Sequence, residues 1–176
     1  MEKAKTKTSV TLQGEYNPEM EKYEGCLLMW PKLAEPGKHN EDATPKYEVE
    51  LQNLCKEDVA LLKTLDPPFV PNDGKKRERP EKGLYCTPKS VRPVPVYDSD
   101  VEIVPLEQVA AIGNESRGNV TVHSYSYSVG GNSGVALGLD SVQITDLKVY
   151  NNNPYLAVEG GYQSPKSHET ADDVPF

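Results

Sequence analysis

Residues 75–92 hold the side chains of this sequence that are best suited to bind an anion. They include seven Lys or Arg residues against two acids, a net charge of +5, in a chain of 176 residues whose total charge is −8. A local positive potential attracts a polyanion in spite of an acidic total. The alternative is a solvated loop. The basic candidates in this stretch are Lys75, Lys76, Arg77, Arg79, Lys82 and Arg92.

Aromatic residues accompany several of these cations in the sequence. Cations that contact phosphates and flat rings that stack on bases hold single-stranded nucleic acid, at about 1–3 kcal/mol for each stacked base. Proteins that read a duplex need an element shaped for a groove, and no basic recognition helix is predicted. The aromatic candidates and one further cation are Trp30, Lys32, Tyr85, Tyr97, Tyr125 and Tyr127.

The sequence lacks the usual signatures of catalysis. It has no GxxxxGK[ST], no GxGxxG after a strand, no GxSxG and no HExxH. Its three cysteines have neither CxxC spacing nor a histidine at a zinc-finger offset, which indicates free thiols. We therefore expect a protein that is not an enzyme and that has no cofactor and no bound metal.

One acidic cluster leaves a metal-dependent alternative open. Asp98, Asp100 and Glu102 alternate on one face of a predicted strand, where they could hold a hard cation as in a nuclease. The other interpretation is a solvated edge whose charges discourage pairing between sheets. A nuclease would cleave DNA in the presence of magnesium.

The elements that must position these residues are mostly strands. KYEVEL, at 46–51, predicts a strand with one buried face, because Tyr47, Val49 and Leu51 alternate with charged residues. Tyr47 is therefore assigned to the core rather than to the surface.

One strong helix is predicted directly after this strand, at 53–68. Asn53 is its expected N-cap, and Pro67-Pro68 is expected to end it. A helix of about three turns is marginal alone, so its apolar stripe is expected to cap the sheet.

A long hairpin is predicted near the end of the chain. GNVTVHSYSYSV, at 118–129, alternates with Tyr125 and Tyr127 on one face, and GGNSG returns the chain into a second strand. In that second strand the apolar phase slips between Gly138 and Ser141, which is typical of a β-bulge.

Together these elements indicate an all-β domain. Prolines at 93, 95 and 105 restrict the strands near them to edges or bends. With further apolar stretches at 9–13 and 25–30, the inventory is five or six antiparallel strands, one capping α-helix and long loops, which favours a small closed or half-closed barrel.

The expected organisation is a flexible basic N-terminus at 1–8, one domain at 9–150 and an acidic C-terminal tail at 151–176. No apolar run approaches the roughly 20 residues that span a bilayer, and the N-terminus has no signal-peptide core, so we expect a cytoplasmic protein without a membrane partner.

The tail ends in SHETADDVPF, which cannot fold alone and is expected to be disordered until it binds a partner. Its acids and terminal aromatic ring suit a basic-rimmed apolar pocket. A frayed terminus is the alternative. The predicted partner-binding residues are Asp172, Asp173, Val174, Pro175 and Phe176.

Three segments in order resemble a known family: KYEVELQNLCKEDVALLKTL, IGNESRGNVTVHSYSYSVGGNSGVALGLDSVQITDL and DDVPF. They are similar to the replicative single-stranded DNA-binding proteins of podophage-type bacteriophages, and the hairpin is the most specific part of a resemblance that covers roughly residues 8–176. The resemblance implies a five-stranded antiparallel OB-type barrel whose helix follows the second strand. It also implies sequence-independent binding of single-stranded DNA in phage replication, recombination and repair.

The same resemblance implies that the tail recruits replication proteins of the polymerase, helicase or primase class in the cytoplasm of an infected bacterial host. The DNA-contacting residues named above rest on local charge and aromatic content, not on the resemblance. The alternative function is a non-enzymatic protein-interaction or structural phage module with no nucleic-acid binding. Whether the protein is a monomer or a dimer is left open.

Overall fold

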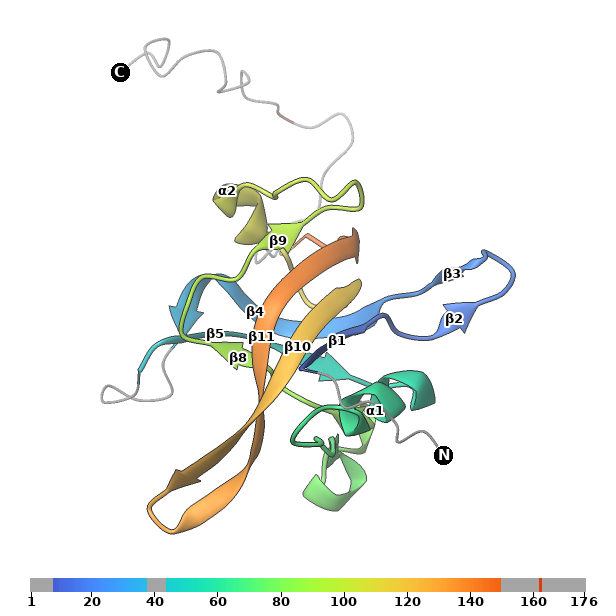
Figure 1. Ribbon diagram of the computed structural model, residues 1–176. Coiled ribbons are helices and arrows are strands. Elements are labelled where there is room, and N and C mark those ends of the chain that lie inside the picture. The colour runs from blue at the N-terminus through green and yellow to red at the C-terminus, as the bar shows by residue number, and fades with distance from the viewer. Residues whose placement is uncertain (1–7, 38–43, 150–161, 163–176) are drawn as a thin grey trace.

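The computed structural model describes residues 8–37, 44–149 and 162. The predicted basic N-terminus up to residue 7 and the tail residues 172–176 lie outside this range. Most of the strand residues in the described ranges belong to one sheet (Figure 1). Its seven strands are β1 (Ser9–Leu12), β4 (Cys26–Gly37), β5 (Lys46–Gln52), β8 (Lys89–Ser90), β9 (Val96–Tyr97), β10 (Ser116–Val129) and β11 (Asn132–Asp146).

Five of these strands form a circuit of pairings. The order is β10-β4-β5-β8-β11, and β10 pairs again with β11. The strand β8 has only two residues and makes few pairings with its neighbours, so the sheet closes only partly into a ring. This is the order of the OB-fold, a partly open five-stranded Greek-key arrangement. The predicted all-β, OB-type architecture is confirmed.

The pairing differs from a purely antiparallel sheet in two places. The short strands β8 and β9 run parallel to β11, one after the other along the same edge. Both come from the proline-rich segment, whose prolines limit each ladder to one or two residue pairs.

The β10–β11 hairpin is formed as predicted, including its bulge. Thr121 pairs with Ser141 and Val122 pairs with Leu139, so Asp140 is the extra residue. Beyond Gly138, which pairs with Lys89 of β8, the two strands extend away from the ring, and the hairpin tip projects from the molecule (Figure 1).

The core lies inside the ring and beneath the helix. Val49 and Leu51 of β5 are fully buried, and Tyr47 packs against the core with part of its ring exposed, as the period-2 pattern predicts. Val120 and Val122 of β10 are also fully buried, which leaves the opposite face of that strand to solvent.

The helix α1 (Lys56–Lys63) follows β5, which is the second of the five circuit strands in chain order, as expected. It is shorter than predicted, and its N-cap is Cys55 instead of Asn53. The Asn53 N–H donates a hydrogen bond to the Lys82 carbonyl, and the φ angle of Asn53 is 52°. Asn53 therefore ends β5 and does not start the helix. The buried Asp58 accepts bonds from the backbone N–H groups of Gln13 and Gly14, which fixes α1 beside β1.

The remaining elements are short. β2 (Tyr16–Asn17) and β3 (Lys22–Tyr23) form a hairpin that projects away from the β10–β11 tip (Figure 1). A one-turn helix, α2 (Leu106–Val109), was not predicted. Residues 72–85 form what we call the basic lobe, with β6 (Asn72–Asp73), η1 (Lys75–Arg77), η2 (Pro80–Lys82) and β7 (Leu84–Tyr85).

None of the helices in the described ranges is long and apolar enough to cross a lipid bilayer.

Candidate nucleic-acid interface

The polar side of β5 is the centre of the candidate site. We call it the β5 face: it consists of Lys46, Glu48, Glu50 and Gln52, with the neighbouring side chains of Trp30, Lys32, Lys82 and Lys89. The alternating pattern predicts that both glutamates face solvent, but each is only 8% exposed. They are covered because β4 and β8 flank β5 and lysine side chains from the neighbouring elements lie against them.

Glu48 joins three strands through two ion pairs. Its Oε1 lies 3.2 Å from Lys32 Nζ on β4, and its Oε2 lies 3.4 Å from Lys89 Nζ on β8. Both lysines are its direct partners in the strand register. Burial alone raises the pKa of Glu48, but the two ammonium groups outweigh burial, and the net pKa lies below its ordinary value.

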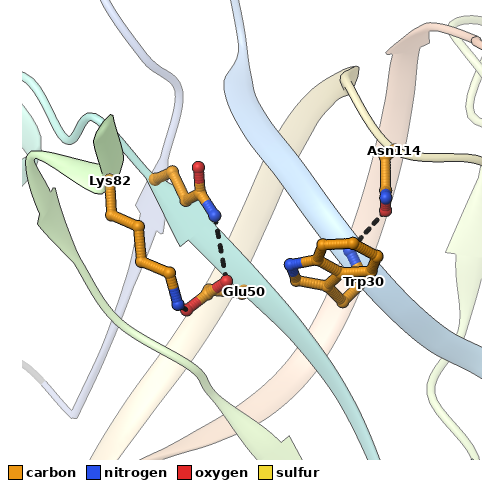
Figure 2. Close-up of polar contacts among 5 residues, drawn as sticks. Trp30, Glu50, Lys82 and Asn114 are labelled. Carbon is orange, nitrogen blue, oxygen red and sulfur yellow. Dashed lines mark hydrogen bonds and ion pairs between the residues drawn. The ribbon is translucent and has the colours of Figure 1, made fainter. Parts of the chain in front are cut away.

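Glu50 connects β5 to the basic lobe. Its Oε1 lies 2.8 Å from Lys82 Nζ, and its Oε2 accepts a 3.0 Å hydrogen bond from Gln52 Nε2 (Figure 2). The Lys82 ammonium also lies 4.9 Å from the centroid of the Tyr85 ring. Lys82 therefore connects the basic lobe to the edge of the β5 face.

Trp30 is placed by a bulge in β4. Met29 pairs with Glu50 and Lys32 pairs with Glu48, so β4 has one more residue than β5 between these pairs. Trp30 lies in this bulge with a φ of 52°, and its N–H donates a 2.7 Å hydrogen bond to Asn114 Oδ1. The indole extends from β4 toward β5 (Figure 2) and is 60% exposed. A bulge that redirects a large exposed ring beside ion-paired lysines makes a platform for stacking.

A groove of about 410 Å³ continues the β5 face at its Lys46 end. Lys46, Lys89 and Arg92 line one side of it, and His123 and Tyr125 line the other. We call it the hairpin groove. It joins three cations and two rings, which is the combination that the sequence predicts for a bound single strand.

The rings beside this groove are held by close backbone contacts. A Cβ atom at Gly138 would overlap the His123 ring, and one at Gly134 would lie 2.7 Å from the Tyr127 hydroxyl. His123 Nδ1 also lies 2.8 Å from Asp140 Oδ1, on the bulge residue. These two glycines allow the rings to lie flat on the hairpin, so their outer faces are directed to solvent.

The β5 face and the hairpin groove together form a track of suitable length. At about 3.3 Å per residue, β5 spans roughly 20 Å from Lys46 to Gln52. OB folds bind about 4–16 nucleotides, so several would fit along the track.

The predicted site residues fall into three groups. Trp30, Lys32 and Lys82 meet on the β5 face, and Arg92 and Tyr125 meet in the hairpin groove. Tyr127 follows Tyr125 on the hairpin and is 42% exposed. The basic lobe carries Lys75, Lys76, Arg77 and Arg79, all exposed.

Two predicted aromatic contacts do not fit this arrangement. Tyr85 is only 9% exposed, and Lys82 lies over its ring, so the ring has no open face for a base. Along β11, Tyr97 pairs with Gln143, whereas Tyr125 pairs with Ala136. These two positions of β11 are seven residues apart. At about 3.3 Å per residue, Tyr97 lies roughly 20 Å farther along the hairpin.

The sequence-based selection missed three residues. Lys46, Lys89 and His123 line the hairpin groove. The period-2 phase of KYEVEL places Lys46 on the polar side of its strand, and Lys89 belongs to the basic stretch. Both signals were present in the sequence, whereas the approach of His123 to Lys89 depends on the pairing of β8 with β11.

The metal-binding alternative does not fit the geometry. The Asp98 carboxylate accepts the backbone N–H groups of Asp100 and Glu102 at 2.9 and 3.0 Å, so it stabilises its own turn. Across residues 8–37 and 44–149, no group of three or more His, Cys, Asp or Glu residues is arranged to hold a metal ion.

The cysteines are free, as expected. Burial raises the pKa of the Cys55 thiol to about 11, and it also raises the pKa values of Cys26 and Cys86. All three are therefore thiols near neutral pH, and none is activated as a nucleophile.

Fold and surface together define an OB-type β protein with a polar, aromatic-edged face. The chain matches no protein-family model and no curated protein. Among solved structures it is similar to the single-stranded DNA-binding protein from bacteriophage Enc34 in complex with ssDNA, with a TM-score of 0.58 and 12% identity over 80% of this chain and 88% of that one. A C-terminal truncation of the Enc34 protein gives a TM-score of 0.56 and 13% identity over 84% and 88% of the two chains.

The bacteriophage T7 single-stranded DNA-binding protein gp2.5 aligns with 16% identity and a TM-score of 0.46 over 80% of this chain and 95% of that one. At these identities the likeness to the Enc34 structures shows a shared fold.

Proposed function

We propose that this protein binds single-stranded DNA without sequence preference, along the β5 face and the hairpin groove, and that it is not an enzyme. The observation that carries the proposal is the meeting of Lys46, Lys89 and Arg92 with Tyr125 and His123 in one groove of an OB-type sheet. In OB folds, ligands bind over the second and third strands and the loops beside them. Here those strands are β5 and β8, and the hairpin tip is one of those loops.

The comparison with Enc34 supports single-stranded DNA as the ligand, because one of the similar structures is described as a complex with ssDNA. Phosphates would contact the lysines of the β5 face and Arg92 of the hairpin groove. Bases would stack on Trp30, Tyr125 and Tyr127. Contacts of both kinds are tolerant of sequence, because every nucleotide has a phosphate and a flat base.

A binding assay with dT oligonucleotides and a duplex of equal length tests the proposal. Fluorescence anisotropy at several salt concentrations should show clear preference for the single strand. If about four phosphates are neutralised, log affinity should fall with log salt at a slope near −3, at roughly −0.7 per contact. Equal or absent binding to both DNAs would favour a protein-interaction module instead.

We further propose roles in phage DNA replication, recombination and repair in the cytoplasm of an infected bacterial host. The C-terminal residues 172–176 would recruit replication proteins of the polymerase, helicase or primase class. Two carboxylates followed by Phe176 support this, since a basic-rimmed apolar pocket can capture both features. Deletion of 167–176 should abolish capture of such a partner while DNA binding persists; unchanged capture would contradict the tail's role.

A further inference from the structure

Three of the four lysines of the β5 face form ion pairs with the two glutamates of the same face, which neutralise most of their charge. Glu48 is paired with Lys32 and Lys89, and Glu50 is paired with Lys82. These five side chains carry a net charge of +1, whereas the three lysines alone would carry +3.

The two kinds of side chain lie at different depths. The Glu48 and Glu50 side chains are 11% and 10% exposed, whereas those of Lys32, Lys89 and Lys82 are 43%, 31% and 23% exposed. The carboxylates therefore form the floor of the face, and the lysine side chains keep a side open to solvent. A phosphate can approach each lysine from that open side.

A carboxylate and a phosphate compete for the same ammonium group. A lysine that already has a carboxylate partner neutralises less of a phosphate's charge, so its contact releases fewer of the cations condensed on the DNA. Its contact with a phosphate is correspondingly weaker. In return, the ion pair fixes the long lysine side chain before DNA arrives, which lowers the entropy cost of the contact.

We propose that Glu48 and Glu50 set the affinity of the DNA site, because they hold its lysines in position and compete with the DNA phosphates for them. The inference rests on the proposed function. Its consequence is a face that holds a single strand with moderate affinity and releases it readily, although its lysines are arranged in advance.

The two glutamates should differ in strength. Glu48 is shared by two lysines across three strands, whereas Glu50 is paired with one. Glutamine has nearly the same shape, keeps a hydrogen-bond acceptor for the lysines and carries no charge to bury. E48Q should therefore release two lysines, and E50Q should release one, with the sheet intact.

The experiment measures the affinity of E48Q, E50Q and E19Q for a dT oligonucleotide over a range of salt concentrations. Glu19 is exposed in the turn of the β2–β3 hairpin, far from the β10–β11 tip (Figure 1), so E19Q is a matched control for total charge. At low salt E48Q should bind about 5- to 20-fold more tightly, with a slope steeper by roughly 0.7 to 1.4. E50Q should bind about 3- to 5-fold more tightly, and E19Q less than about 2-fold, since a distant exposed charge is largely screened.

Circular dichroism and thermal unfolding test whether each variant is folded. If E48Q is unfolded, E50Q tests the inference at an independent position. Affinities of E48Q and E50Q that equal that of E19Q, or that fall below wild type in folded protein, would overturn the inference while the proposed function stands. Failure of the wild-type protein itself to bind single-stranded DNA would overturn both.

Discussion

The basic residues between Lys75 and Lys89 form two regions that are adjacent in the sequence and different in structure. In the basic lobe, Lys75, Lys76, Arg77 and Arg79 are exposed, and none of them belongs to an ion pair within the described part of the chain. On the β5 face, Lys82 and Lys89 are half-buried and paired with nearly buried glutamates. A single run of positive charge in the sequence has thus become two sites with different physical properties.

The difference determines what each region can do. Exposed and unpaired cations attract an anion over about 8–10 Å, and salt screens that attraction. Paired and partly buried cations act at short range and have fixed positions. In the proposed complex with DNA, the basic lobe would supply attraction, and the β5 face would supply contacts of defined geometry beside Trp30.

The largest expected effect comes from removing the unpaired charges. K75A/K76A/R77A/R79A should weaken binding to single-stranded DNA by on the order of 100-fold at low salt and make the salt slope less negative by about 0.7 to 1.4, since the β5 face and the hairpin groove keep their own phosphate contacts. The matched control is K22A/K56A/K63A/K148A, which removes four exposed lysines elsewhere. Equal losses in both variants would mean that only total charge matters and would remove the distinction between the two regions.

The second effect concerns the rings beside the paired lysines. W30A and Y125A should each lose about 1–3 kcal/mol of binding free energy, with little change in salt slope, because stacking releases few ions. Y23A is the control, since Tyr23 is 45% exposed on the β2–β3 hairpin, like the 41% exposed Tyr125. Anisotropy titrations measure all three variants. A loss in Y23A as large as that in Y125A would argue against a localised platform.

The third effect tests whether the rings of the hairpin groove are fixed by the backbone. G138A adds a methyl group where the His123 ring lies, so it should lower the free energy of unfolding by about 1–3 kcal/mol. The double variant G138A/H123A should regain part of this loss, because removing the ring removes the overlap. Chemical denaturation measures both. Equal stability of the single and double variants would show that the ring does not occupy this position.

Local patterns in the sequence were sufficient for the elements that depend on local pairing. The period-2 phase of 118–129 and the glycine-rich turn predicted β10 and β11, and the phase slip located the bulge at Asp140. KYEVEL predicted β5 and its buried apolar residues Val49 and Leu51 for the same reason. In these segments neighbouring residues determine both the strand and the face that it buries.

The composition of the site depends on contacts between distant segments, which no local pattern contains. Glu48 is covered because β4 and β8 pair on either side of β5. Trp30 is positioned by Asn114, 84 residues away in the sequence. The position of Tyr85 among basic residues in the sequence favours stacking on a base, but the pairing of this residue within the basic lobe buries the ring.

The smallest expected effect is a difference in how the free energy of unfolding depends on pH between variants of a paired residue, Glu48, and an unpaired residue, Lys75. Because its lysine partners lower the Glu48 pKa below the ordinary 4.5, the unfolded chain takes up this proton first as pH falls. The stabilisation from Glu48 is therefore complete above about pH 5 and is lost as pH falls through its folded-state pKa. The difference in unfolding free energy between wild type and E48Q should shrink from pH 7 to pH 3, whereas that between wild type and K75A should stay constant. Urea denaturation across this range measures both differences, and a constant E48Q difference would show that Glu48 and its lysines do not form a stabilising pair.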